Sequence, residues 1–368
     1  MPLSLLVKPV SGRCNMRCKY CFYAEETARR AAGDAGVMSE RTMENLIARA
    51  FRHAQDSVYF AFQGGEPSLA GVDFFRRAVR LQEEHSAGRI PFFNSLQTNG
   101  LCLSDELIAF LAEKRFLVGV SLDGTQQAHD RYRLDASGRP TWARVRETLE
   151  RLRRAGVEVN ILCVVTREIA RDPEAVFKSL QPYGYLQFIP CLDPLDEPPG
   201  EWTPDAQEFG RFLTQTYRLY RRALLRGSYV SVRAFDNFLN MRRGQEPDSC
   251  AQCGRCAPYF VVEADGSVYP CDFYALDEWR LGNINETGFD RLARSPVASR
   301  FLAASLPVPE PCRRCGCYSL CRNGCRRERL PESGLHRYCA AYRALLPSLL
   351  REDACDPLPA RCPSGAGG

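Results

Sequence analysis

Six apolar segments alternate with five amphipathic segments through the first half of the chain, and this alternation restricts the possible folds more than any other feature. The strand candidates span residues 3–10, 57–62, 91–97, 116–122, 157–165 and 185–191. The helix candidates lie near residues 39–54, 72–87, 104–114, 141–155 and 173–181. Such alternation indicates a parallel sheet with covering helices, and the near-continuous apolar runs suit strands that are buried on both faces. We therefore expect an α/β fold with a partial (β/α)6 TIM-like barrel over residues 1–230.

A long helix is expected to lead out of this barrel. Thr203 can cap its start, Pro204 suits its first turn, and Gly227 suits its end. Beyond it, over residues 231–345, cysteines recur and long periodic elements are few. The apolar content of this part is thin, so we expect a second domain that metals hold together. The tail, residues 346–368, ends in a Pro/Gly-rich stretch and is expected to be disordered.

Cysteine is the unusual residue of the composition, with 18 Cys against 4 His in 368 residues. The chain shows no secretory signal and no stretch as long as a membrane span, and its net charge of +5 comes without a dense Lys/Arg run. We therefore expect a cytoplasmic protein that binds neither membrane nor nucleic acid. In a reducing cytosol, clustered cysteines indicate metal binding or catalysis, and thiolate-only sites leave zinc or iron–sulfur.

Three cysteines follow the first strand candidate, in the stretch SGRCNMRCKYCFY. Cys14, Cys18 and Cys21 should lie near the strand's carboxyl end, where a parallel β/α barrel carries its chemistry. Each iron of a [4Fe–4S] cluster takes a thiolate, so three cysteines leave one iron open, as catalytic metal sites do. A bidentate ligand, for example an amino acid's amine and carboxylate, can occupy that position. A three-Cys zinc site or a helix face, which these spacings also fit, remains an alternative at this point.

The spacing C-x3-C-x2-C with an aromatic residue before the last Cys resembles the radical S-adenosylmethionine (SAM) enzymes. The stretch FQGGEP at 62–67 resembles the glycine-rich turn that these enzymes place against the methionyl amine of SAM. The resemblance implies a barrel of the radical SAM type and SAM contacts from Tyr20, Gly65, Ser121, Arg133 and Leu192. Without the resemblance, an ordinary turn, a strand-end hydroxyl and a core leucine are the simpler interpretations.

The later cysteines fall into the stretches SCAQCGRC, VVEADGSVYPCDFY, CRRCGCYSLCRNGC and HRYC. A hairpin that turns at Asp265-Gly266 is expected in the second stretch. From the spacing alone, a pair of zinc ribbons remains open. The layout C-x2-C-x5-C-x3-C followed by a distant Cys resembles the SPASM domain, which implies two auxiliary [4Fe–4S] clusters and three clusters in all. The implied ligands are Cys250, Cys256, Cys271 and Cys325 for one cluster and Cys312, Cys315, Cys321 and Cys339 for the other.

Seven of the 18 cysteines stay outside these three ligand sets: Cys102, Cys163, Cys191, Cys253, Cys317, Cys355 and Cys362. We expect them to be buried small residues or thiols of the tail. Two of them, Cys253 and Cys317, each lie inside a ligand stretch and could replace a neighbouring ligand.

Seven longer stretches narrow the resemblance, up to about residue 345, to the anaerobic sulfatase-maturating enzymes: LSLLVKP, FAFQGGEPSLAG, NSLQTNG, FLVGVSLDG, NILCVVT, LQFIPCLDPL and DGSVYPCDFYALDEWRLGNI. This resemblance implies oxidation of one Cys or Ser side chain in a sulfatase polypeptide, within a C/S-x-P-x-R segment, to Cα-formylglycine. It implies a radical made by reductive cleavage of SAM, and an electron donor such as ferredoxin or flavodoxin.

The resemblance also implies the catalytic base, Asp272, because the family places its base in the stretch CDFY directly after a cysteine ligand. Without the resemblance, Asp272 would be a carboxylate that accepts hydrogen bonds at a hairpin end. Gln63 and Tyr23 are expected substrate contacts in a cleft between the barrel and the second domain. Two alternatives stay open: another radical SAM/SPASM peptide maturase that forms a thioether or crosslink, and a zinc-stabilised scaffold without catalysis.

Overall fold

A computed structural model describes residues 2–31, 33–195, 198–257 and 259–351 of the chain. Its strands are β1 (Leu3–Val7), β2 (Val58–Phe62), β3 (Phe92–Thr98), β4 (Leu117–Ser121), β5 (Glu158–Val165), β6 (Tyr185–Pro190), β7 (Ser231–Val232), β8 (Phe260–Val262), β9 (Ser267–Tyr269) and β10 (Gly282–Asn283). In the described part of the chain these ten strands form one sheet, in the order β10-β9-β8-β1-β2-β3-β4-β5-β6-β7. Neighbours from β8 through β1 to β7 are parallel, whereas β9 pairs antiparallel with both β8 and β10.

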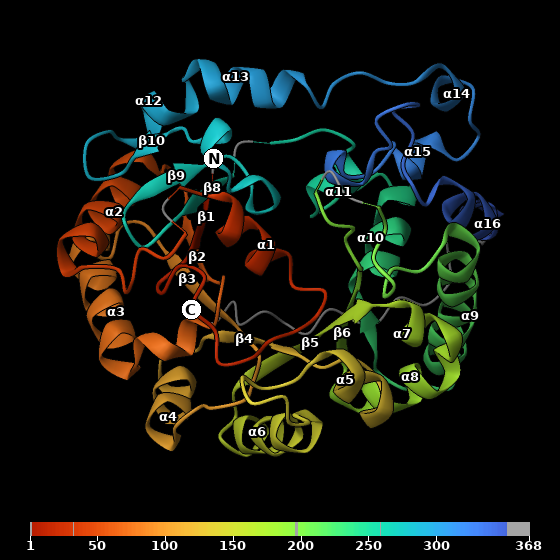
Figure 1. Cartoon of the computed structure of the whole chain (residues 1–368), viewed down its shortest axis with the longest axis horizontal. Helices are drawn as coiled ribbons and strands as arrows, with labels where there is room; N and C mark the ends of the chain where they lie inside the picture. Colours follow the sequence, from red (N-terminus) through yellow and green to blue (C-terminus); the bar gives the residue numbers. More distant parts are fainter. Residues whose placement is uncertain (1, 32, 196–197, 258, 352–368) are drawn as a thin grey trace.

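Helices follow the strands in the alternation expected from the sequence. The α-helices are α1 (Phe22–Arg29), α2 (Glu40–His53), α3 (Val72–Ser86), α4 (Asp105–Glu113), α5 (Gln126–Tyr132), α6 (Trp142–Arg154), α7 (Arg167–Arg171), α8 (Pro173–Leu180), α9 (Ala206–Leu225), α10 (Arg233–Arg242), α11 (Cys250–Cys253), α12 (Phe289–Ala293), α13 (Pro296–Ala303), α14 (Glu310–Arg313), α15 (Tyr318–Cys321) and α16 (Cys339–Arg351). The 3-10 helices are η1 (Pro67–Ala70), η2 (Gln181–Tyr183), η3 (Asp272–Tyr274), η4 (Asp277–Trp279) and η5 (Arg326–Glu328). Figure 1 shows α2, α3, α4, α6 and α8 around the outside of the strands, with α1 near the middle of the view.

The two faces of the sheet have different partners. The outer face packs on the helices: the ring of Phe60 in β2 lies 6.1 Å from that of Phe51 in α2, and both side chains are buried. The inner face lines a cavity with residues from four neighbouring strands, among them Gln97, Ser121, Leu162 and Ile189. The sheet ends at β10 and β7 and does not close on itself, so the expected partial parallel barrel is confirmed.

The start of the long helix α9 differs from the prediction. Its N-cap is Asp205, whose side chain accepts hydrogen bonds from the backbone N–H groups of Gln207 and Glu208, while the Glu208 carboxylate accepts one from the Asp205 N–H. Thr203 lies outside the helix, so the expected Thr203/Pro204 start is wrong. A reciprocal capping box satisfies two N–H groups at once and therefore outcompetes a lone hydroxyl cap. Gly227, with φ of 74°, follows the helix end as expected.

The predicted hairpin forms and joins the barrel sheet. Strands β8 and β9 pair antiparallel around Asp265 and Gly266, and Gly266 has a φ of 85° that suits glycine. Because β8 also pairs in parallel with β1, the hairpin extends the sheet beyond the first strand. Cys271 and Asp272 lie two and three residues after the end of β9 at Tyr269, so the hairpin brings them to the barrel rather than leaving them in a remote domain.

The last described helix, α16, packs against α9. The Phe209 and Tyr338 rings lie 4.2 Å apart, and a side chain at Gly210 would meet the Ala341 backbone at 3.1 Å. Leu346 and Leu349 are fully buried, so helix rather than tail occupies residues 346–351. The remainder of the expected tail, with its cysteines at 355 and 362, lies outside the described residues. Among the described helices, none has the length and hydropathy that a bilayer crossing requires.

Candidate active site

A cavity of about 170 Å³ lies at the carboxyl ends of the barrel strands. It brings together all the residues expected around the first cluster and SAM: Cys14, Cys18, Cys21, Tyr20, Gly65, Ser121, Arg133 and Leu192. The expected substrate contacts, Tyr23 and Gln63, line the same cavity. The chain therefore gathers these side chains from distant segments at the end of the barrel where parallel β/α folds carry their sites. Their individual roles remain predictions.

The three cysteines of this cavity lie close enough to influence one another. Burial and the neighbouring Cys21 thiolate raise the pKa of Cys14 above its ordinary value, although backbone contact with Met16 opposes the shift. Burial raises the pKa of Cys18 to about 12, against the opposing charge of Arg133. Metal binding requires the thiolate form, so a cluster would replace the protons that these buried thiols otherwise keep. Three thiols and an adjoining ligand-sized space suit a cluster with one open iron.

The glycine-rich turn is packed directly on the cysteine loop. Gly65 has a φ of 57°, and a Cβ there would lie 2.3 Å from the Arg13 carbonyl oxygen. The next residue, Glu66, donates its backbone N–H to the same Arg13 oxygen at 2.8 Å. The buried Glu66 carboxylate accepts hydrogen bonds from the Thr98 hydroxyl at 2.8 Å and from the Asn99 N–H at 2.7 Å. Glycine is therefore required both by the left-handed backbone and by the close approach of the loop.

Asp272 lies beside the two expected substrate contacts. Its Oδ2 accepts hydrogen bonds from the Tyr23 hydroxyl at 2.5 Å and from Gln63 Nε2 at 3.2 Å. Gln63 Nε2 also donates to the Tyr23 oxygen at 2.6 Å, so the three side chains form one connected group. Among the described residues, the buried Asp272 Oδ1 has no hydrogen-bond partner. Oδ2 is thus held by the two cavity residues, while Oδ1 faces the Lys8 ammonium at 3.7 Å.

The neighbouring residue, Phe273, lies in the segment expected to belong to a second domain and lines the cavity. Its ring lies 5.1 Å from the ring of Phe22, which belongs to the cysteine loop, in an edge-to-face arrangement. The cavity therefore has walls from the first half of the chain and from the segment after β9.

A buried group of charges surrounds Asp272. Lys8 Nζ lies 3.2 Å from Glu263, 3.7 Å from Asp272 Oδ1 and 3.8 Å from Glu26, and Arg30 forms a further ion pair with Glu263. Burial raises the pKa of Asp272 above its usual value, and the Lys8 charge opposes the rise. Burial likewise raises the pKa of Glu26 to about 8. Burial alone would lower the pKa of Lys8, but the surrounding carboxylates, chiefly Glu263, raise it.

Sequence reasoning missed this charged group and one further carboxylate, Asp123, which contacts Tyr20 and Arg133. A usable signal was present: Lys8 and Glu263 each directly follow an apolar strand that reads as buried on both faces. A charged side chain at such a position needs a buried partner of opposite charge. The partner's identity depends on the β1–β8 pairing, which the sequence did not predict.

The first auxiliary ligand set is brought together from three segments. Burial and the neighbouring Cys325 and Cys250 thiolates raise the pKa of Cys271. Burial raises the pKa of Cys325 to about 12, and Cys250 and Cys256 add to the shift. All four expected ligands therefore lie near one another. Cys253 also lies close to Cys250, whose pKa it helps to raise after the larger effect of burial, so its own role stays open.

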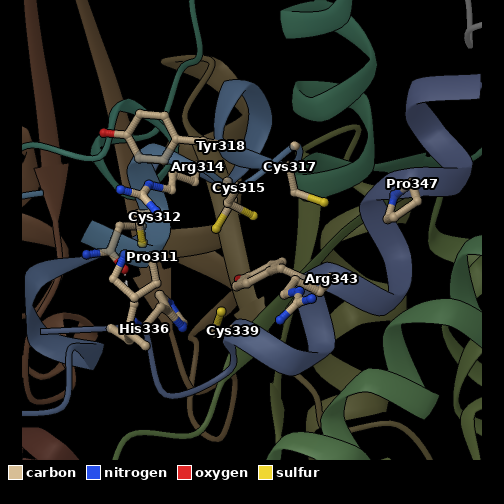
Figure 2. A pocket seen from close by; sticks show the side chains of 15 residues that line it. Pro311, Cys312, Arg314, Cys315, Cys317, Tyr318, His336, Cys339, Arg343 and Pro347 are labelled. Carbon is tan, nitrogen blue, oxygen red and sulfur yellow. Dashed lines mark hydrogen bonds between the residues drawn. The ribbon is translucent and has the colours of Figure 1, made fainter. Parts of the chain in front are cut away.

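The second auxiliary set lines a separate cavity of about 460 Å³. Its thiols come from Cys312, Cys315, Cys317, Cys321 and Cys339. Figure 2 shows Cys312, Cys315 and Cys339 around this space, with Arg314 and Arg343 at its edge and Cys317 set toward Pro347. Burial and the Cys339, Cys312 and Cys315 thiolates raise the pKa of Cys321 to about 11. A space bordered by more than four thiols suits a fully ligated [4Fe–4S] cluster.

No three His, Cys, Asp or Glu side chains of the described residues are placed to hold a single metal ion. The zinc-site alternative for these cysteines therefore has no preformed tetrahedral site in the described part of the chain to support it. The same finding does not bear on clusters, whose four irons spread their ligands more widely.

Comparison with known proteins gives two domain matches. Residues 9–180 match the radical SAM superfamily, and residues 253–316 match the iron-sulfur cluster-binding SPASM domain. The fold resembles that of SuiB from Streptococcus suis at a TM-score of 0.64 and 14% identity, over 96% of this chain and 78% of the other, which indicates a shared fold alone.

Similarity over nearly the full length is higher for one kind of enzyme. The cysteine-type anaerobic sulfatase-maturating enzyme of Clostridium novyi is 41% identical, over 89% of each chain, and that of Clostridium perfringens is 40% identical over 93% and 95%. The serine-type enzyme of Klebsiella aerogenes is 30% identical over 95% of this chain and 86% of its own. A structure described as native anSMEcpe with bound AdoMet and Cp18Cys peptide matches at 39% identity and a TM-score of 0.90, over 95% and 98%. The chain is a radical SAM enzyme that belongs to the family of anaerobic sulfatase-maturating enzymes.

Proposed function

We propose that this chain oxidises a cysteine side chain of a sulfatase polypeptide to Cα-formylglycine. Family membership supports the reaction class, and a related structure that carries a peptide supports a polypeptide substrate. The observation that carries the proposal is the position of Asp272, which is buried beside the three-cysteine cavity, bonded through Oδ2 to the cavity residues Tyr23 and Gln63 and paired through Oδ1 with Lys8. A base must lie within hydrogen-bond reach of the proton that it takes.

The residues of the cavity divide between cofactor and substrate. Cys14, Cys18 and Cys21 would hold the catalytic cluster, and Tyr20, Gly65, Ser121, Arg133 and Leu192 would contact SAM. When bound, the cluster and SAM would supply a radical able to remove one hydrogen atom from Cβ of the target residue. Tyr23 and Gln63 orient the target beside Asp272, and the aromatic wall formed with Phe273 excludes water from the reacting atoms.

Asp272 completes the oxidation by accepting the proton of the target's sulfur. The target then loses one hydrogen atom, one proton and one electron in total, which leaves a thioaldehyde. Water replaces the sulfur to give the aldehyde and hydrogen sulfide. Lys8 lies 3.7 Å from Asp272 Oδ1 and fixes the carboxylate opposite the bonds from Tyr23 and Gln63. Cys271 adjoins Asp272, so the first auxiliary ligand set lies beside the place where the electron is lost.

A cysteine target is favoured over a serine target by the comparisons, since the cysteine-type relatives are 40–41% identical and the serine-type relative 30%. The experiment is anaerobic incubation of the reconstituted enzyme with SAM, a reductant and matched peptides that carry Cys or Ser in a C/S-x-P-x-R segment. Mass spectrometry should detect aldehyde from the Cys peptide at the higher rate. Equal rates would overturn the cysteine preference, and unchanged masses for both peptides would overturn the proposed reaction.

The base assignment has its own test. Asp272→Asn should cleave SAM but form product about 100-fold more slowly or worse, since a positioned general base contributes at least ~10²-fold. Asp73→Asn, at an exposed position far from the cavity, is the matched control and should behave as wild type. Product formation by Asp272→Asn at the wild-type rate would show that another group takes the proton.

Two further assignments belong to this proposal. A low-potential carrier such as ferredoxin or flavodoxin supplies the first electron, and the enzyme works in the cytoplasm, where thiols stay reduced before clusters are inserted. Adding a reduced carrier in place of a chemical reductant tests the first assignment: SAM cleavage should proceed, and its absence with every carrier tried would contradict it.

A further inference from the structure

We infer that Asp123 is a positioning residue that holds Tyr20 and Arg133 in the orientation in which they meet SAM. The inference deepens the proposed function, because it rests on the assignment of Tyr20 and Arg133 as SAM contacts. Asp123 itself does not line the cavity, whereas both of its partners do. It therefore acts on the cofactor site only through them.

Asp123, Tyr20 and Arg133 form a closed group of side chains. The Tyr20 hydroxyl donates a hydrogen bond to Asp123 Oδ2, and Arg133 Nη1 lies 3.9 Å from the same oxygen. Arg133 Nη1 also donates to the Tyr20 oxygen at 2.9 Å. Asp123 Oδ1 accepts the backbone N–H of Val164 at 2.9 Å, which fastens the carboxylate to β5. Because all three side chains contact one another, neither cavity residue can reorient alone.

A second chain of hydrogen bonds holds the backbone of the same group. The Asp123 N–H donates to His129 Nδ1 at 3.2 Å, so the ring proton lies on Nε2. Nε2 then donates to the Thr141 hydroxyl at 3.0 Å, and that hydroxyl donates to the Arg133 carbonyl oxygen at 2.7 Å. Burial lowers the pKa of His129 to about 2, so the ring stays neutral and keeps this tautomer. The backbones of Asp123 and Arg133 are thus linked independently of their side chains.

The burial of this group makes the carboxylate necessary. The side chains of Asp123 and Arg133 are only 2% and 7% exposed. Among the described residues, the buried Arg133 Nε already lacks a hydrogen-bond partner. Removal of the Asp123 charge would leave a buried guanidinium without its counter-ion, and such a group moves toward water or toward another anion. Either movement takes Arg133 away from the position in which it lines the cavity.

The test compares SAM binding by Asp123→Asn and by the wild-type holoenzyme, measured by anaerobic equilibrium dialysis with radiolabelled SAM. The Kd should rise about tenfold to hundredfold, which corresponds to the loss of a charge-assisted contact. Iron content should stay at about twelve per chain. The matched control is Asp236→Asn, because Asp236 also accepts a tyrosine hydroxyl in the interior but lies away from the SAM cavity; its Kd should equal that of wild type.

Kinetics separate positioning from general destabilisation. At saturating SAM, Asp123→Asn should recover most of its SAM cleavage rate, and Asp123→Glu should restore part of the affinity, whereas a structural defect would respond to neither. A wild-type Kd in Asp123→Asn, or an equal rise in Asp236→Asn, would overturn the inference. If Asp123→Asn does not fold, Thr141→Val removes the hydroxyl that links the His129 ring to the Arg133 carbonyl, and an unchanged Kd in that variant would overturn the inference as well.

Measuring SAM binding and peptide modification separately in the wild-type enzyme distinguishes this inference from the proposed function. Wild-type enzyme that binds SAM but leaves sulfatase peptides unchanged would contradict the proposed substrate and leave the role of Asp123 testable. Wild-type holoenzyme that does not bind SAM would contradict both.

Discussion

The two thiol-lined cavities of this chain differ in what accompanies the sulfur. The barrel cavity is lined by three cysteines, a glycine turn and aromatic side chains, and the buried group of carboxylates around Lys8 lies next to its lining residues Tyr23 and Gln63. The cavity around Cys315 combines five cysteines with exposed arginines at its rim and with buried His336, whose Nε2 lies 3.3 Å from the Glu328 carboxylate. The side chains around the first suit the binding of an organic ligand, and those around the second suit the ligation of a cluster.

This difference shows that cysteine spacing alone does not separate catalysis from electron transfer. CxxC spacings occur in both cavities. The distinguishing feature is the number of thiols relative to the irons and the set of polar side chains that shares the space. An open site requires other residues to hold the ligand at the vacant position, and the barrel supplies them from several strand ends.

The largest effect on the proposed difference between the two cavities is expected when the thiols of the barrel cavity are removed. Replacing Cys14, Cys18 and Cys21 together with Ala should abolish SAM cleavage and leave about eight of the about twelve irons, because the eight auxiliary ligands remain. Iron and sulfide analysis with a SAM cleavage assay measures both. Retained SAM cleavage would assign the open site to another cluster and invalidate the division between the cavities.

The reciprocal change is made in the other cavity. Cys312→Ala should lower the iron content by about four per chain, because a [4Fe–4S] cluster that lacks one ligand is readily lost. SAM cleavage driven by a chemical reductant should persist. Formylglycine formation should fall, because the electron lost by the target residue would no longer have an auxiliary cluster to accept it. Loss of SAM cleavage in this variant would mean that the two cavities are not independent. Ser348→Ala, which changes a nearby hydroxyl of α16, serves as the control.

Removal of a positive charge should affect the free energy of unfolding much more beside the barrel cavity than at the rim of the Cys315 cavity. Lys8→Met should lower the free energy of unfolding by ~3–5 kcal/mol, because it leaves Glu263, Glu26 and Asp272 buried without their shared cation. Arg343→Met at the exposed rim should change it by less than ~0.5 kcal/mol. Thermal unfolding of the two reconstituted variants under anaerobic conditions makes the comparison. A similar melting temperature for both would show that the buried charges are compensated by other means.

The glycine turn should give a smaller effect confined to the barrel cavity. Gly65→Ala introduces a Cβ 2.3 Å from the Arg13 oxygen at a positive φ, so the turn or the cysteine loop must shift. We expect a loss of ~1–3 kcal/mol in stability and weaker SAM binding, with the auxiliary irons retained. The control is Gly71→Ala, also at positive φ but with open space around its Cβ; it should lower stability without changing the Kd for SAM.

Most of the barrel was predictable because its elements repeat a local pattern. The strand and helix ranges differ from expectation by one to three residues at their ends, as β1 illustrates by stopping at Val7. The cavity residues were predictable because their spacing and order match a family. The pairing of β8 with β1 was not, since it joins residues more than 250 positions apart. The buried group around Lys8 and the contacts of Asp123 depend on such distant pairings, so local periodicity does not encode them.

The smallest expected effect concerns the surplus thiol of the Cys315 cavity. Cys317 is buried, lies directly before α15, and points toward Pro347 in Figure 2 while it stays close to Cys315. If it only packs, Cys317→Ser should keep all of the about twelve irons, whereas Cys315→Ser should lose about four. Iron analysis and the EPR spectrum of the dithionite-reduced protein measure the two variants side by side. Iron loss in Cys317→Ser with full iron retention in Cys315→Ser would show that Cys317, and not Cys315, is the cluster ligand. The cluster would then be bound by Cys312, Cys317, Cys321 and Cys339.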